Sequence, residues 1–325
     1  MTLVRMTLAA LAPALFTTAL AVSAAAQDTY PSRTVELVVP FAAGGGTDLL
    51  ARLLSDGLGK RLGQSFVVLN RPGANTNVGT QLVARAKPDG YMLVMASIGL
   101  AANPSLYKKL AFDPLNDLAP ISLIANSPTI LVVAPSVAAS SLSELIALTK
   151  TRPGELNYAS YGVGSGPHLA TELFRFKTGT NIVHVPFSGG GPAAVGVMNN
   201  TVQMLFSSVL PVLGLVRNGS LKPIAVAAER RSPLLPDVPT FAESGVDYQT
   251  GTWFGLLAPA RTPDDIIAAL HKSTVDTLQD GDVRRRIAEQ GGEVVGNAPA
   301  QFRAFIKEET DRLSAVIRNA NIQID

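Results

Sequence analysis

The sequence predicts an α/β protein of two consecutive lobes, each a mostly parallel sheet flanked by helices. Two observations support this prediction. Strand-like segments alternate with glycine-rich turns and helix-like segments, which is typical of βαβ units. The alternation restarts at Thr129, which indicates a second unit. With 325 residues, 47% of them hydrophobic, the chain is long enough for two moderate lobes with ample cores.

The first lobe begins with a β-branched strand predicted over residues 35–41. A glycine-rich turn over residues 42–46 follows, and Thr47 opens a helix whose leucines recur with the 3.6-residue period until Gly63. The lobe continues with a strand at 66–69, a helix at 79–86 and a strand at 91–96.

The second lobe repeats this alternation. Its first helix has a capping box, because Ser141 is followed three residues later by Glu144. Its strands are predicted at 130–133, 156–161, 182–187, 202–206 and 224–228, and its helices at 142–150, 167–176 and 192–199. A strand at 253–258 and helices at 263–278, 283–290 and 299–319 form a tail. The periodicity leaves open whether this tail returns to the first lobe.

The first 26 residues have the features of a cleavable secretory signal peptide. Arg5 gives a positive start, an apolar run extends from Leu8 to Val22, and small residues precede Gln27. The alternative is a membrane anchor, but this run of about 15 residues contains Pro13 and is shorter than the ~20 needed to span a bilayer. We therefore expect cleavage after Ala26 and export of the mature chain.

The composition excludes several classes of function. The chain has no cysteine, so it has no disulfide, thiol nucleophile or cysteine metal site, and three histidines leave little room for a histidine metal site. Its net charge of +2 gives nucleic acid no attractive field. We expect no cofactor and no bound metal.

Three strand–turn–helix junctions, at residues 40–48, 160–168 and 186–192, are rich in glycine. Glycine lets a ligand approach the backbone, and the first turn of a helix presents free N–H groups at the positive end of its dipole. In an open parallel sheet these turns lie at the carboxyl ends of the strands, where ligands bind. The junctions therefore predict a cleft that closes on a small anion, although each turn alone is also consistent with a tight connection only.

Individual side chains in these junctions have structural alternatives. Asp48 complements a helix dipole or contacts the ligand, and His168 is structural or reaches the cleft. His184 and His271 are expected to be packed or solvated. The junction at residues 162–167 matches neither the hydrolase elbow nor the dinucleotide fingerprint, so no enzymatic template fits.

The chain resembles the periplasmic solute-binding receptors of tripartite tricarboxylate transporters, also called the Bug family. The matching segments keep the order of the family and cover nearly the whole mature chain. They lie at 30–33, 38–48, 63–64, 67–74, 87–91, 103–107, 164–170, 184–187, 235–240 and 258–260.

The resemblance implies a two-lobed type II periplasmic binding protein fold, hinged by two crossings, in which the tail returns to the first lobe. Residues 27–126 and 250–325 would form lobe 1, and residues 127–249 would form lobe 2. It further implies a small mono- or dicarboxylate ligand, membrane transporter subunits as partners, a monomeric periplasmic receptor, and no enzymatic activity.

Position by position, the resemblance implies a ligand site of loop backbone and hydroxyl groups from both lobes. Its members are Phe41, Ala43, Gly44, Gly45, Gly46, Thr47, Asp48, Asn75, Thr76, Ser97, Ser160, Tyr161, Gly164, Ser165, His168, Phe187 and Ser188.

The chain departs from the family pattern at several positions. The family usually has glycines at Asn75 and Thr76, which here either add donors to the pocket or make the turn rigid. It often has an aspartate at Ser207. Two other functions remain as alternatives: a periplasmic ligand-sensing adaptor for a signalling system, and an exported hydrolase using Ser165 or Ser188, which lacks a convincing base.

Overall fold

The computed structural model describes residues 30–44, 46–248, 250–289 and 291–324. The expected signal peptide and Gly45 lie outside these residues. The strands are β1 (Val35–Val39), β2 (Phe66–Asn70), β3 (Met92–Ala96), β4 (Leu118–Val133), β5 (Asn157–Ser160), β6 (Val183–Pro186), β7 (Met204–Ser208), β8 (Lys222–Ala227), β9 (Gly251–Pro259) and β10 (Glu293–Val294).

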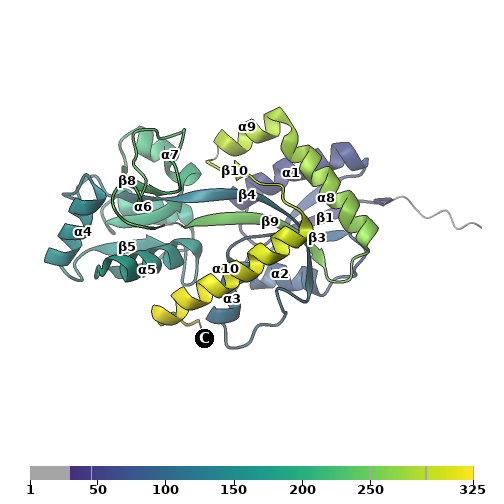
Figure 1. Cartoon of the computed structure of the whole chain (residues 1–325), viewed down its shortest axis with the longest axis horizontal. Coiled ribbons are helices and arrows are strands. Elements are labelled where there is room, and N and C mark those ends of the chain that lie inside the picture. Colours follow the sequence, from purple (N-terminus) through teal and green to yellow (C-terminus); the bar gives the residue numbers. More distant parts are fainter. Residues whose placement is uncertain (1–29, 45, 249, 290, 325) are drawn as a thin grey trace, which may run out of the picture.

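The helices flank these strands and cover them from both sides (Figure 1). They are α1 (Gly46–Leu62), α2 (Asn77–Ala84), α3 (Gly99–Leu106), α4 (Leu142–Thr151), α5 (Gly166–Thr178), α6 (Gly190–Met198), α7 (Val209–Arg217), α8 (Asp264–Gln279), α9 (Gly281–Glu289) and α10 (Pro299–Asn319).

Two parallel three-stranded units lie at opposite ends of one continuous sheet, whose strand order is β2-β1-β3-β9-β4-β7-β5-β6. In the first lobe, β1 pairs in parallel with β2 and β3. In the second lobe, β5 pairs in parallel with β6 and β7. The fold is the two-lobed α/β fold that the alternation predicts.

The strands β4 and β9 connect the two lobes. The first part of β4 pairs antiparallel with β9, and from Thr129 onward β4 pairs with β7 and β8 instead. The N–H of Thr129 donates to the carbonyl of Thr250, so the two points at which the chain crosses lie side by side. Both strands run across the middle of the molecule in Figure 1.

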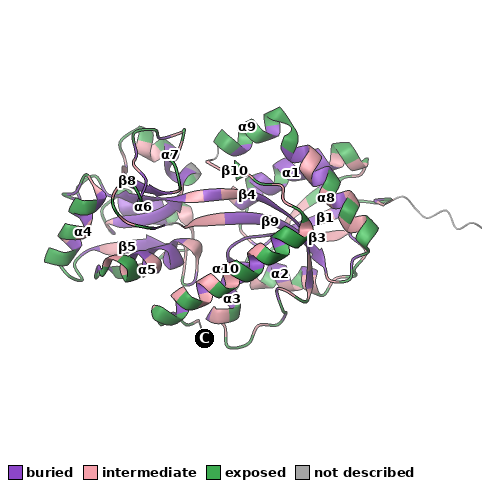
Figure 2. Cartoon of the chain, viewed as in Figure 1, coloured by how far each residue is buried: buried purple, intermediate pink, exposed green. Residues whose placement is uncertain are grey.

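Each lobe has its own hydrophobic core. The second-lobe core contains an aromatic group in which Phe174, Phe206, Phe241 and Tyr248 pack with ring centroids 4.5–6.2 Å apart. The first-lobe sheet has a core on each face, one beneath α1, α8 and α9 and one beneath α2, α3 and α10. Figure 2 shows this division as buried strands between helices whose outer faces are exposed.

The helix α10 packs against strands and helices of the first lobe. Phe302 is fully buried and packs edge to face against Trp253 of β9. Leu169 of α5, from the second lobe, is buried in the same cluster as Leu106 of α3 and Leu313 of α10. The two lobes therefore share apolar contacts on the side of α3, α5 and α10.

The helix α10 lies along the lower side of the crossing strands in the view of Figure 1, beside α3 and α5. Its buried face consists of Phe302, Ile306, Leu313 and Ile317. Within the described residues, no helix is long and apolar enough to cross a membrane.

Several segments differ from the sequence prediction. The strand β4 begins at Leu118, twelve residues before the predicted strand at 130–133, because the register shifts near Pro120 let the ladder continue past that proline. The helices α3 and α7 are absent from the prediction. Each contains a proline, Pro104 or Pro211, which lowers the helical signal of a short segment.

Candidate functional site

The loop between β1 and α1 is held by the side chain of Asp48. Gly44 has φ +85°, and its N–H donates to Oδ2 of Asp48 over 2.9 Å. Arg52 donates to both carboxylate oxygens at 3.0 and 3.1 Å, and Asn70 Nδ2 donates to Oδ1 at 2.9 Å. Asn70 also donates to the carbonyl of Phe41 at the other end of the loop. Asp48 therefore fixes the backbone of this loop.

The pKa of Asp48 lies below its usual value. Burial alone raises the pKa, but the hydrogen bonds from Arg52, from the Gly44 N–H and from Asn70 outweigh that effect. The carboxylate is thus charged at neutral pH, and four donors occupy it. This arrangement favours the structural alternative for Asp48 over direct contact with an anion.

The loop between β5 and α5 is held by His168 in a matching way. Gly164 has φ +75°, and its N–H donates to Nδ1 of His168 over 3.0 Å. Because Nδ1 accepts, the neutral ring carries its proton on Nε2. Ser165 at the start of α5 donates its hydroxyl to the carbonyl of Gly162 over 2.6 Å. The side chains of this loop therefore bond mainly within the loop.

His168 belongs to a stack of three rings beneath the loop. Its ring lies 4.0 Å from that of His184, with an interplanar angle of 11°, and the ring of His184 lies 4.9 Å from that of Tyr158. Nε2 of His184 is 2.6 Å from the hydroxyl oxygen of Ser160, at the end of β5. Two residues of the predicted site are thus connected to a histidine that the sequence places outside it.

Both stacked histidines have lowered pKa values, so both are neutral at neutral pH. Burial, with smaller contributions from His184 and Arg175, lowers the pKa of His168 to about 3. Burial also lowers the pKa of His184, while the carboxylate of Glu172 partly opposes this shift. Glu172 is itself bound by Arg175 at 2.6 and 2.8 Å. The charges that surround the stack are therefore already paired.

The turn before α2 contains three consecutive residues in the left-handed region, Ala74, Asn75 and Thr76, with φ of 44°, 47° and 79°. Non-glycine residues seldom adopt this conformation, and Asn is among those that tolerate it best. The glycines that the family usually has at positions 75 and 76 would adopt it without strain. The turn thus needs the left-handed conformation at both positions, and in this chain Asn75 and Thr76 adopt it in place of glycine.

Both amide hydrogens of Asn75 are directed to protein acceptors. Nδ2 donates to Oδ1 of Asn103 over 2.8 Å and to the carbonyl of Gly164 over 3.2 Å. The second contact joins the two lobes. Asn75 therefore does not present a free amide N–H to the cleft in this arrangement, and Thr76 is buried at the start of α2.

The remaining predicted residues differ in exposure. Those with little exposure are Thr47, Ser97 and Ser160, and those that are exposed are Ala43 and Ser188. The ring of Phe187 lies against α6, where a Cβ added at Gly196 would come within 2.7 Å of it, so this glycine admits the ring. The hydroxyl of Tyr161 lies 2.6 Å from that of Ser207.

A small cavity of about 30 Å³ is lined by residues of both lobes. Gly46 at the start of α1 and Ser208 at the start of α7 both line it. The hydroxyl of Ser127, on β4, also lines it and is buried without a partner in the described part of the chain. The start of α7 is therefore a second-lobe helix N-terminus that the sequence prediction lacks, although a hydroxyl residue before an apolar run signals one.

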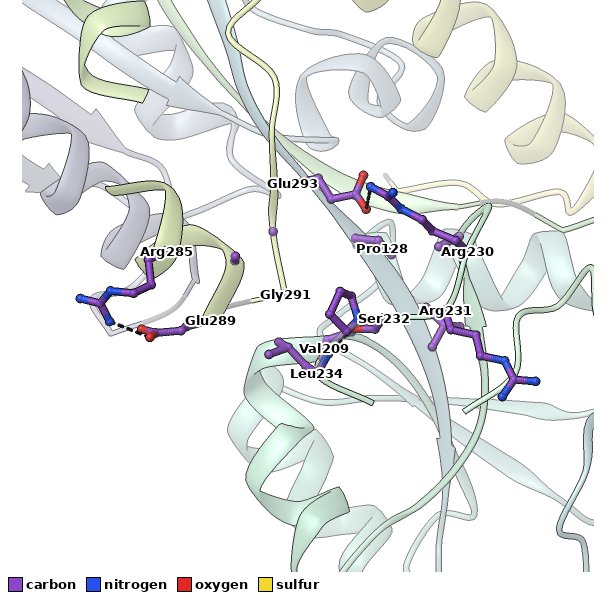
Figure 3. A pocket seen from close by; sticks show the side chains of 15 residues that line it. Pro128, Val209, Arg230, Arg231, Ser232, Leu234, Arg285, Glu289, Gly291 and Glu293 are labelled. Atoms are coloured by element: carbon purple, nitrogen blue, oxygen red, sulfur yellow. Dashed lines mark hydrogen bonds and ion pairs between the residues drawn. The ribbon is translucent and has the colours of Figure 1, made fainter. Parts of the chain in front are cut away.

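A larger cavity of about 310 Å³ lies away from the predicted loops (Figure 3). It is bordered by α9 and β10 of the first lobe and by α7 and the loop after β8 of the second. Arg230 and Glu293 approach to 4.0 Å across it, and Arg285 pairs with Glu289 at its rim. These arginines are thus paired with carboxylates. Among the described residues, no group of three or more side chains could hold a metal ion.

Comparison with known proteins identifies the family. The chain matches the tripartite tricarboxylate transporter family receptor over residues 50–322. The chain belongs to this family. Its receptors are periplasmic solute-binding proteins and not enzymes.

Three relatives show how far the similarity extends. Protein BugT of Bordetella pertussis is 38% identical over 300 residues, which cover 91% of this chain and 92% of BugT. The structure of Rpa4515 of R. palustris with adipate has a TM-score of 0.85 and 35% identity, covering 91% of this chain and all of that one. The structure of MatC from Rhodopseudomonas palustris with bound malate has a TM-score of 0.81 and 34% identity, covering 89% and 100%.

Proposed function

We propose that this receptor captures a small carboxylate between its two lobes and delivers it to the membrane subunits of a tripartite tricarboxylate transporter. The observation that carries the proposal is the meeting of loops from both lobes. Gly46 and Ser208 line one cavity, and Asn75 bonds to Gly164 across the lobes. Two structural neighbours hold adipate and malate, which supports a dicarboxylate of about four to six carbons.

The chemistry of the loops favours an anion held by backbone and hydroxyl groups. Among the predicted site residues, Asp48 is the charged one, and Arg52 neutralises it. The N-termini of α1 and α7 supply N–H groups and positive dipole ends. Hydrogen bonds to a charged group contribute roughly 1.5–3 kcal/mol each. Four or five of them, less the ordering costs, give a micromolar or tighter dissociation constant, about −8 kcal/mol.

We propose that closure occurs by bending where β4 and β9 cross. Residues 27–126 and 250–325 would then move as one lobe against residues 127–249. The adjacent crossings at Thr129 and Thr250 support this, because two neighbouring strands form a compact hinge. The receptor would act as a monomer in the periplasm after removal of residues 1–26.

Thermal unfolding of the purified mature protein with a panel of mono- and dicarboxylates tests the proposal. A carboxylate present at ~100 times its dissociation constant should stabilise the protein by about 2.7 kcal/mol. Native mass spectrometry should show the same acid bound. If no carboxylate shifts the transition and no small acid is carried through purification, the proposed function is wrong.

A pair of variants at one position separates charge from size. A Cβ added at Gly46 has no atom within 4 Å, so both Gly46→Asp and Gly46→Asn fit the backbone. The aspartate would repel a carboxylate and should weaken binding at least tenfold, while the asparagine should weaken it only slightly. Equal binding by the two variants would show that no anion lies near the start of α1.

A further inference from the structure

We propose that Asn75 is a latch between the lobes: a positioning residue whose side chain holds the closed arrangement and slows ligand release. The inference rests on the proposed function, because it concerns the closing of the same cleft. The latch consists of Asn75 and Asn103 of the first lobe and the carbonyl of Gly164 of the second. It gives the departure from glycine at position 75 a specific role.

The amide of Asn75 is oriented by a buried network. Asn103, on α3, is 1% exposed, and its Nδ2 donates to the carbonyl of Asn75 over 2.7 Å and to Oδ1 of Asn77 over 2.6 Å. Its two amide hydrogens are thus used, so its Oδ1 faces Nδ2 of Asn75 at 2.8 Å. The second hydrogen of Asn75 is then free to reach Gly164. The network therefore aims one donor across the lobe boundary.

The left-handed backbone of Asn75 places its side-chain amide within reach of the carbonyl of Gly164. Asn75 has φ +47°, between Ala74 and Thr76 in the same region. A turn of this kind costs free energy at each non-glycine residue, and it persists because the surrounding contacts determine it. The bonds to Asn103 hold both the side chain and the carbonyl of Asn75, so the side chain is preorganised before the lobes meet.

Gly164 is a residue at which the second lobe approaches the first closely. A Cβ at this position would lie 2.7 Å from Cδ1 of Leu106 and 2.8 Å from Cδ1 of Ile324. Its N–H is bound by His168 and its carbonyl by Asn75. The ligand loop of the second lobe is therefore held from its own side by His168 and from the other lobe by Asn75.

A contact that forms only when the lobes are together stabilises the closed state selectively. One neutral hydrogen bond corresponds to a factor of about 2 to 13 in the closed population, from its net 0.5–1.5 kcal/mol. Such an effect is expected mainly in the dissociation rate, because the ligand leaves when the lobes open. The latch should thus lengthen the residence time without contacting the ligand.

The test compares Asn75→Gly with Ala74→Gly; Ala74 has the same left-handed backbone, with φ 44°, and lies outside the predicted ligand site. Glycine adopts the left-handed conformation at both positions, but only the first variant removes the bond to Gly164. The probe is adipate or malate, whichever stabilises the wild-type protein. Asn75→Gly should release it about 3- to 10-fold faster in a stopped-flow displacement, while Ala74→Gly should stay within about twofold. Asn75→Asp should release it faster still, because carboxylate oxygens would face the acceptors of Gly164 and Asn103.

A distance measurement tests the latch without any ligand. The chain has no cysteine, so Leu82→Cys on α2 and Phe176→Cys on α5, at positions 42% and 65% exposed, allow two spin labels. With Asn75 intact the label distances should form one narrow distribution. Asn75→Gly should broaden it or shift it to longer distances.

The two readouts separate the possible failures. If the wild-type protein binds no carboxylate, the proposed function fails, and the label distances still decide the latch. If the wild-type protein binds but Asn75→Gly and Asn75→Asp change neither the dissociation rate nor the distances, the latch is wrong. Should Asn75→Gly fail to fold, Asn75→Asp tests the same contact.

Discussion

The glycine-rich loops at residues 40–48 and 160–168 each fix a glycine N–H, but they use different side chains to do so. In the first lobe, the N–H of Gly44 donates to Asp48, and in the second lobe the N–H of Gly164 donates to His168. In both loops the glycine has positive φ and the acceptor lies four residues later in the first turn of the helix. The acceptor is a carboxylate in one lobe and a neutral imidazole in the other.

The two loops require opposite protonation states of their acceptors: Asp48 must be deprotonated and charged, and His168 must be neutral. Asp48 must be ionised to accept from its four donors, and Arg52 compensates its charge. His168 must be neutral, because a protonated Nδ1 cannot accept from Gly164. The second loop is thus fixed without a negative charge, but it is sensitive to acid.

The largest expected effect is therefore a loss of stability in acid that depends on His168. The pKa of His168 is about 3 in the folded protein, whereas its ordinary value, expected in the unfolded chain, is 6.5. The unfolded chain therefore binds a proton at His168 more tightly than the folded protein does. The free energy of unfolding then falls as the pH decreases from about 6.5 toward about 3. This contribution amounts to about 3 kcal/mol between pH 7.5 and pH 4. Urea denaturation at a series of pH values measures it.

The matched variant is His168→Asn, which keeps an acceptor at the spacing that Asp48 uses. Its stability should decrease about 2–3 kcal/mol less than that of the wild-type protein over the same pH range. His184, whose pKa is also lowered, accounts for part of the slope that remains. Parallel curves for the two proteins would mean that His168 is not held neutral by the fold.

The next largest effect is the difference in stability between Gly44→Ala and Gly164→Ala. A Cβ at Gly44 meets nothing within 4 Å, so Gly44→Ala should cost only the left-handed strain, about 1 kcal/mol. Gly164→Ala adds crowding against Leu106 and Ile324 and should cost about 2–3 kcal/mol. The unfolding free energies of the two variants measure the difference. Equal values would show that the lobes are not in close contact at Gly164.

Much of the fold follows from the sequence because its strands and helices obey local rules. Residues 35–39, 66–70 and 92–96 are strands within a residue or two of the prediction, since β-branched and apolar runs end at glycine or polar turns. The sequence predicts only the last part of the long strand β4. Pro120 and Pro128 interrupt its pattern, and only the pairing with β9 shows that both are accommodated.

The glycine-rich loops that are predicted to hold the ligand can be recognised in the sequence, but the long-range partners of their side chains cannot. Glycine clusters before helices identify residues 41–48 and 160–168 by local chemistry. The bond from Asn70 to Asp48 spans 22 residues, and that from Asn75 to Gly164 spans 89. Such contacts depend on the tertiary arrangement, so spacing along the chain carries no signal of them.

The smallest expected effect is at Asp48. Asp48→Asn removes the charge that Arg52 compensates. It also places an amide N–H donor next to the donors of Gly44, Arg52 and Asn70. Because Arg52 is half exposed and can be solvated, the cost should be about 1–2 kcal/mol at pH 7. The lowered pKa of Asp48 means that its stabilising contribution is present above about pH 4 and lost below that. Between pH 4 and pH 7 the variant should therefore run parallel to the wild-type protein in urea denaturation, in contrast to His168→Asn. A change of slope in that range would place the titration of Asp48 there and would remove the distinction between the two loops.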